Sequence, residues 1–193
     1  PEGVALRIDP SFGFDLNVHY ANYSDDVIIG DVYNNYHFID STDVDHIGKI
    51  LQLNNNDIVL PPGEETTLNK TFWMFAEFGE IISIFQLFSH AHKHNTEFKV
   101  FRRSQSDPYY KELIYLALDW DHPPIIEYDP PMVFHEGDGL ELESTFYNDT
   151  DEEINFGLLS TDEMMILFGL YYEGENLATC LLYTSDAADD SLR

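Results

Sequence analysis

Short apolar or alternating segments recur along the whole chain, and turn-forming residues separate them. Segment 140–146 alternates strictly: Leu140, Leu142 and Phe146 fall on one face, and glutamates fall on the other. Alternation with a period of two is typical of a strand with one face in solvent. Segment 164–172 is instead apolar on both faces, as expected for a central strand covered on both sides. Further strands are expected at residues 14–20, 33–39, 49–53, 66–75, 81–92, 97–102, 112–118, 131–135 and 154–158.

These segments predict an all-β protein, because no segment keeps a helical period over several turns. The apolar and alternating segments are also interrupted by two proline-containing turns, Pro61-Pro62-Gly63 and Pro123-Pro124. Many short strands with regular turn signals favour an antiparallel β-sandwich, and we expect a jelly roll. A length of 193 residues fits one domain with a real core and part of a second.

The net charge of the chain limits the classes of partner that it can bind. It carries 36 acidic against 9 basic side chains, a formal net charge of −27, which argues against nucleic acid or an anionic membrane as partner. No apolar run reaches the length of a membrane span. The acids lie among abundant hydrophobic and aromatic residues, so they indicate the surface of a folded protein. Such a surface fits an exported protein, and we predict a secreted or periplasmic location.

The two ends of the chain carry separate expectations. It begins with Pro1 and not with Met, so we expect the natural N-terminus to lie upstream. Residues 180–190 resemble the conceptual translation of a sequencing-library transposase adapter, and we expect residues 180–193 to be disordered sequence of that origin. The sole cysteine, Cys180, lies there, so the sequence predicts no disulfide framework and no thiolate chemistry.

Candidate chemistry is concentrated at two strand ends. His90 and His92 flank one alanine at the end of an apolar run, and Met164-Met165 begins another. Residues two apart on a strand share a face, so both imidazoles can reach one ion. Imidazole with thioether is a ligand set for copper that cycles through Cu(I). The two methionines point to opposite faces, so only one of them can serve. The pattern also fits two strand histidines that bind nothing, with the methionines as core fillers.

Other interpretations remain open at this point. His90 and His92 with Glu97 have the His-x-His-x4-Glu spacing of cupin metal sites, although the usual flanking glycines are absent. A non-catalytic sandwich module of an exported protein is another alternative. Gln86 is a candidate to orient an imidazole, because it lies on the same strand face as His90. His94 continues the spacing of His90 and His92 by two more residues. We expect its side chain to be in solvent, and a position near the copper is the alternative.

Four segments, taken in order, resemble the copper type II, ascorbate-dependent monooxygenases, the family of peptidylglycine α-hydroxylating monooxygenase and dopamine β-monooxygenase. The resemblance covers most of residues 1–173. Its motifs are Pro1-Glu-Gly-Val4 followed by Leu16-Asn-Val-His19-Tyr20, then Ile58-Val-Leu-Pro-Pro-Gly-Glu64, Phe88-Ser-His90-Ala-His92, and Leu159-Ser-Thr-Asp-Glu163-Met164 followed by Tyr171-Tyr172.

The resemblance implies which residues would bind copper. His90, His92 and Met164 would bind the copper at which dioxygen is activated and a small-molecule substrate is hydroxylated. His19 would be one ligand of a second, electron-supplying copper, whose other ligands the family supplies from upstream sequence. The resemblance therefore implies two coppers in the full-length protein and one in this chain, with ascorbate as the reductant.

The same resemblance implies a domain organisation. Residues 1–25 would end the N-terminal copper domain, and residues 26–179 would form the C-terminal copper monooxygenase domain. We expect the chain to be inactive as an enzyme without the missing N-terminal domain.

Three positions depart from the peptide-amidating members of the family. Phe88 stands where those members carry an arginine that holds a substrate carboxylate, and Ile166 and Phe168 replace an asparagine and a tyrosine. The departures favour an apolar or aromatic substrate, whose identity the sequence leaves open. The family's disulfides are absent as well, which favours a bacterial-type branch.

Overall fold

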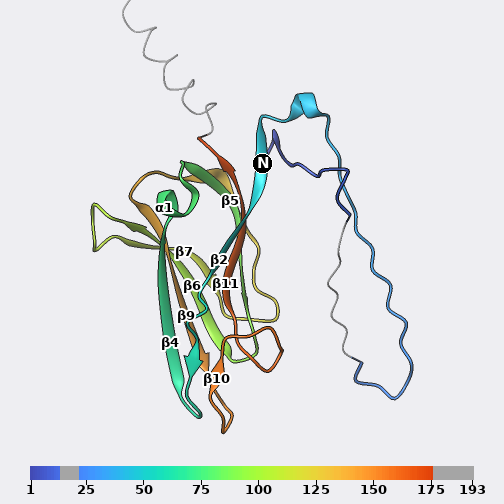
Figure 1. Cartoon of the computed structure of the whole chain (residues 1–193), viewed down its shortest axis with the longest axis vertical. Helices are drawn as coiled ribbons and strands as arrows, with labels where there is room; N and C mark the ends of the chain where they lie inside the picture. The colour runs from blue at the N-terminus through green and yellow to red at the C-terminus, as the bar shows by residue number, and fades with distance from the viewer. Residues whose placement is uncertain (14–21, 176–193) are drawn as a thin grey trace, which may run out of the picture.

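Two β-sheets form the body of the molecule in the computed structural model, which describes residues 1–13 and 22–175 (Figure 1). The five-stranded sheet has the order β1 (Val4–Leu6), β2 (His46–Asn54), β11 (Met165–Glu173), β5 (Ile82–Ala91) and β8 (Ile126–Phe134). The four-stranded sheet has the order β4 (Glu65–Trp73), β9 (Asp138–Tyr147), β6 (Asn95–Ser104) and β7 (Lys111–Ala117). A small third sheet pairs β3 (Val59–Leu60) with β10 (Ile154–Asn155). The all-β prediction is confirmed, and the jelly-roll connection pattern stays a prediction.

Helical structure is minor in this part of the chain. A 3₁₀ turn spans Ser41–Asp43, and α1 (Met74–Phe78) follows directly on β4. The strand expected at 66–75 ends at Trp73, where α1 begins. The sequence did not predict this helix, because five residues are too few to show a helical period. Gly79 ends α1 with a left-handed backbone, φ 79°, and donates its N–H to the carbonyl of Phe75. No helix within the two described ranges has the length and hydrophobicity that a membrane span requires.

The core fills the space between the two larger sheets. Leu140, Leu142 and Phe146 are fully buried, as the alternation of β9 predicts. Leu87 of β5 and Leu167 of β11 are equally buried and belong to the same core cluster. The inner faces of β5 and β11 are thus fixed in the core, and their alternate residues face outward.

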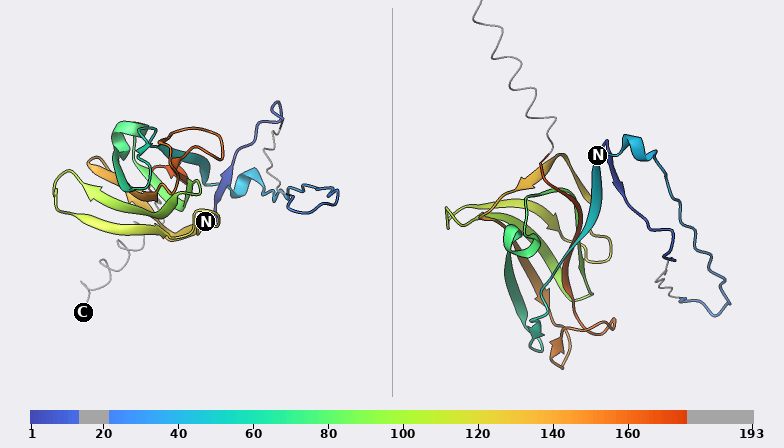
Figure 2. Two further views of the ribbon diagram at one scale, coloured as in Figure 1. Left: turned by 90° about the horizontal axis from the view of Figure 1, so that it is seen from below. Right: turned by 45° about the horizontal axis from the view of Figure 1, so that its top comes forward.

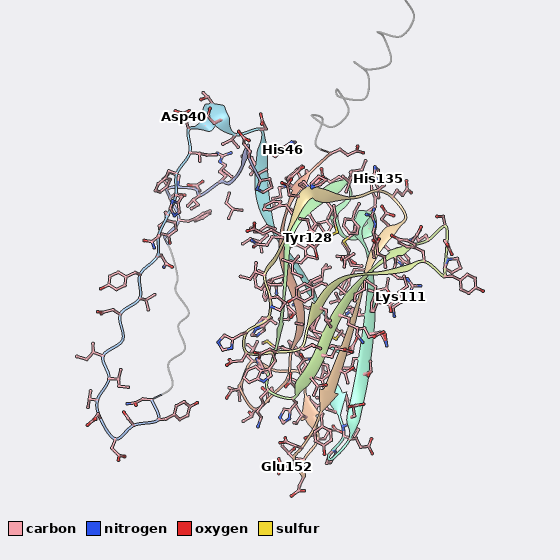
Figure 3. The ribbon with its side chains drawn as sticks, turned by 180° about the vertical axis from the view of Figure 1, so that it is seen from behind. Asp40, His46, Lys111, Tyr128, His135 and Glu152 are labelled. Carbon is pink, nitrogen blue, oxygen red and sulfur yellow. The ribbon has the colours of Figure 1, made fainter. Side chains whose placement is uncertain are left out.

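The N-terminal part departs from the expected strands. Residues 33–39 form no strand, and residues 22–40 run outside the sandwich with many exposed apolar side chains (Figures 1 and 2). Figure 3 shows Asp40 at the upper end of this excursion, from which a short turn leads to His46 and β2. Strand-forming residues need a neighbouring strand to pair with, and among the described residues no strand pairs with this segment. The strand expected at 14–20 lies outside the described residues.

One strand pair at the edge of the five-stranded sheet is parallel. β1 pairs with β2 in parallel, with Val4 opposite His46 and Leu6 opposite Gly48. The long excursion between the two strands makes this possible, because parallel neighbours need a long connection. All other strand pairs of the described chain are antiparallel.

Candidate metal centre

The two histidines of the predicted site project from the outer face of the five-stranded sheet. Ser89 and Ala91 on β5 are buried in the core, so the intervening His90 and the following His92 point away from it. Both are half-buried, and their ring centroids lie 5.4 Å apart with the rings nearly perpendicular. Across the antiparallel ladder, His90 is opposite Ile166 of β11. The first step of the sequence argument, that both imidazoles share one face, therefore holds.

The neighbouring methionines separate as alternation requires. Met165 is fully buried in the core, and the side-chain amide of Asn55 lies 3.4 Å from its Sδ. Met164 precedes β11, retains 9% exposure and lies outside the core cluster. Met165 points inward, so strand alternation continued by one residue before β11 would direct Met164 to the side of Ile166 and His90. Of the two methionines, Met164 is therefore the one that is not committed to the core.

The type of third ligand follows from the residues nearby. Within residues 1–13 and 22–175, no three His, Cys, Asp or Glu side chains are grouped so that they could hold a metal ion. If His90 and His92 hold a metal, a third protein ligand would be a donor of another kind or would come from residues outside these ranges. The Met164 thioether is such a donor, and it is soft enough to favour Cu(I). The donor set thus fits copper.

His92 is oriented by the chain segment that carries Met164. Its Nδ1 lies 2.8 Å from the carbonyl oxygen of Asp162, two residues before Met164. A carbonyl oxygen only accepts hydrogen bonds, so Nδ1 must carry the proton. In the neutral ring the lone pair is then on Nε2, which is the arrangement found in most metal-binding histidines.

Between Asp162 and Met164 stands a residue that the residue-type argument missed. The Glu163 side chain is fully buried. Its carboxylate accepts hydrogen bonds from the backbone N–H groups of His92 at 2.9 Å, His94 at 2.8 Å and Met164 at 3.2 Å. In the sequence Glu163 was only one letter of a family motif. A glutamate in a polar turn gives no signal of burial.

A buried tyrosine supports β5 just before His90. The Tyr115 hydroxyl on β7 accepts the N–H of Ser89 at 2.9 Å and donates to the carbonyl of Pro124 at 2.9 Å. The ladder between β5 and β8 ends at Leu87 opposite Ile126. Beyond that point, the Tyr115 hydroxyl supplies the hydrogen-bond acceptor for the β5 backbone. Burial raises the pKa of Tyr115, so the hydroxyl keeps its proton at neutral pH.

Two phenyl rings adjoin the histidines on the outer face. Phe88 of β5 and Phe168 of β11 are directly opposite in the ladder, and their rings stack with centroids 5.4 Å apart. The Phe168 centroid lies 6.3 Å from that of His90. The surface beside the candidate centre is therefore aromatic, as the departures at these positions indicate.

The expectation for His94 is wrong. His94 is only 3% exposed, and its Nδ1 lies 3.2 Å from the Asp149 carboxylate. β5 ends at Ala91 and a turn follows, so strand alternation does not extend to His94. Its Nε2 is buried and has no hydrogen-bond partner among the described residues.

The remaining sequence candidates fall elsewhere. Glu97 lies on β6 in the opposite sheet and pairs with Lys99, so the cupin-type His-x-His-Glu set is not assembled. The Gln86 amide lies 3.4 Å from the Glu127 carboxylate on β8, and its role toward an imidazole stays a prediction. His19 lies outside the described residues, so the second copper site stays a prediction as well.

Comparison with known proteins gives one match. A family model described as copper type II ascorbate-dependent monooxygenase, C-terminal domain, matches residues 46–191. None of the curated proteins matches the chain significantly. The family match begins at the first residue of β2 and includes His90, His92 and Met164. It also runs into the adapter-like segment, whose origin stays a prediction.

Proposed function

Since this chain belongs to the copper type II ascorbate-dependent monooxygenase family, through its C-terminal domain, we propose that His90, His92 and Met164 bind its oxygen-activating copper. The observation that carries the proposal is the hydrogen bond between His92 Nδ1 and the Asp162 carbonyl, 2.8 Å long. It joins the two strand ends that bear the candidate ligands and leaves Nε2 of His92 as the metal donor. The burial of Met165 in the core supports Met164 as the sulfur ligand.

Each residue of the site has a task that its chemistry allows. Bound copper would supply one-electron redox chemistry and the activation of dioxygen. The imidazoles of His90 and His92 tolerate both oxidation states, and the Met164 thioether favours the reduced one. The Asp162 carbonyl holds the proton on Nδ1 of His92 and so fixes the orientation of that ring.

We further propose that the substrate is apolar or aromatic near the carbon to be hydroxylated. The stacked rings of Phe88 and Phe168 lie beside His90 on the outer face. Phenyl rings bind apolar groups through hydrophobic and stacking contacts and offer no hydrogen bond to a carboxylate. Phe88 occupies the position at which a peptide-amidating relative would need its arginine.

The chain by itself should bind one copper without completing turnover. The second, electron-supplying copper would use His19 together with histidines from upstream sequence. A single imidazole does not hold copper tightly, so the reaction would lack its second electron. We therefore expect ascorbate to reduce the bound copper while substrate stays unchanged.

Titration with Cu(I) in competition with a chromophoric chelator tests the ligand assignment. The unaltered chain should bind one equivalent, and His90→Ala, His92→Ala and Met164→Leu should each weaken affinity at least about tenfold. His122→Ala is the matched control, because that side chain is 81% exposed on a loop. Unchanged affinity in His90→Ala or His92→Ala, with the fold intact, would refute the assignment.

A further inference from the structure

The buried carboxylate of Glu163 stands out among the described residues. It is the one acidic side chain there with no exposed surface, and no lysine, arginine or histidine of that part of the chain pairs with it. Burying a carboxylate is costly unless its oxygens are well satisfied. Three backbone N–H groups provide that here. A cost of this kind calls for a role that a smaller apolar residue could not fill.

The carboxylate joins two strands where their own pairing stops. The ladder between β5 and β11 ends with Ala91 opposite Met165. One residue further on, Oε2 of Glu163 accepts both the N–H of His92 and the N–H of Met164. A single oxygen atom therefore bridges the backbone of two candidate copper ligands.

The other carboxylate oxygen and the Glu163 backbone are anchored as well. Oε1 accepts the N–H of His94 in the turn that follows His92. The Glu163 N–H donates to the carbonyl of Asn155 at 3.1 Å, and its carbonyl accepts the N–H of Gly157 at 3.2 Å. The Glu163 carboxylate with the three N–H groups that it accepts is called the Glu163 clamp below. Its backbone is held by the residues next to β10, at the lower end of the sandwich in Figure 1.

We propose that Glu163 is a positioning residue that fixes the separation and orientation of His92 and Met164, and thereby the affinity and geometry of the copper site. The inference rests on the proposed function, because it takes these two residues as copper ligands.

Two substitutions at Glu163 change the length of the side chain and its charge separately. Glu163→Gln keeps the length but removes the charge and sets an amide NH₂ against a backbone N–H. Glu163→Asp keeps the charge but is one methylene too short to reach all three N–H groups. We expect Cu(I) affinity to fall about 10- to 100-fold in both variants, as for other residues that orient metal ligands: in Glu163→Asp because the reach is lost, and in Glu163→Gln because the amide NH₂ opposes one of the backbone N–H groups. The EPR spectrum of the Cu(II)-loaded protein should change in both.

The matched control acts at the opposite end of the same two strands. Ser83 on β5 is fully buried, and its hydroxyl donates to the carbonyl of Gly174 just beyond β11 at 2.7 Å. Ser83→Ala therefore loosens the same strand pair far from the ligands. It should lower thermal stability yet leave the Cu(I) affinity and the EPR spectrum of the unaltered chain.

Three results would overturn the positioning role. The first is a folded Glu163→Gln with unaltered affinity and EPR spectrum, and the second is an equal loss of affinity in Ser83→Ala. Hydrogen exchange of the unaltered chain supplies the third and needs no variant to fold: the amides of His92, His94 and Met164 should be protected. Rapid exchange of all three would refute the clamp. If His90→Ala leaves copper binding unchanged, the proposed function fails instead, whatever Glu163 does.

Discussion

Replacement of Tyr115 by phenylalanine tests how the core supports the strand that carries His90. The ring is 1% exposed and would stay in place, so the substitution removes one oxygen and creates no large cavity. That oxygen accepts the N–H of Ser89 and donates to the Pro124 carbonyl, both at 2.9 Å. The change therefore isolates the hydrogen bonds of one buried hydroxyl.

The expected cost follows from the burial of the two partners. Pro124 is exposed, so its carbonyl can turn to water at little cost. Ser89 is only 4% exposed, and its N–H would be left without an acceptor inside the protein. An unsatisfied buried N–H costs about 1–3 kcal/mol. At about 2–4 °C per kcal/mol, Tm should fall by about 4–8 °C for a loss near 2 kcal/mol.

Thermal and urea unfolding followed by circular dichroism measure this loss. Tyr109→Phe is the control, because Tyr109 is 92% exposed and its substitution should change stability by less than about 0.5 kcal/mol. Equal stability of Tyr115→Phe and the unaltered chain would show that the Ser89 N–H finds another acceptor. Equal losses in both variants would show that the burial argument is wrong.

Two further predictions concern alkaline stability and the C-terminal segment. Burial raises the pKa of Tyr128 to about 12 from its ordinary 10.0, so the stability that this group contributes is complete below pH 10 and is lost as the pH rises through 12. Urea unfolding from pH 9 to 11 should show the decline, with a smaller slope in Tyr128→Phe; identical slopes would contradict the assignment. Removal of residues 180–193 should leave Tm unchanged, because these residues resemble adapter sequence, and a fall of several degrees would show that they pack against the domain.

Most strands could be predicted because burial on one face imposes a period of two on the sequence. Segment 140–146 shows this most clearly, since its inward residues are fully buried. The same reasoning failed at residues 33–39, where apolar and aromatic residues form no strand. Local sequence records the preference for an extended chain, but a strand also needs a partner to pair with.

The placement of the candidate ligands on the strands was predictable in part, while their binding of copper stays a prediction. The spacing of His90 and His92 already placed both on one face, and the core position of Met165 agrees with the choice of Met164. The parts that the sequence did not reveal depend on contacts distant along the chain. Glu163 meets the N–H of His92 and His94 some seventy residues away, and His94 turns inward to Asp149. No local pattern records such contacts.

X-ray absorption at the copper edge of the reduced, copper-loaded chain tests the central claim most directly. A copper held by His90, His92 and Met164 should show a sulfur scatterer together with imidazole nitrogens. The sulfur contribution should disappear in Met164→Leu and persist in Met165→Leu, whose methionine lies in the core. Scattering from nitrogen and oxygen alone in the unaltered chain, or sulfur retained in Met164→Leu, would contradict the account.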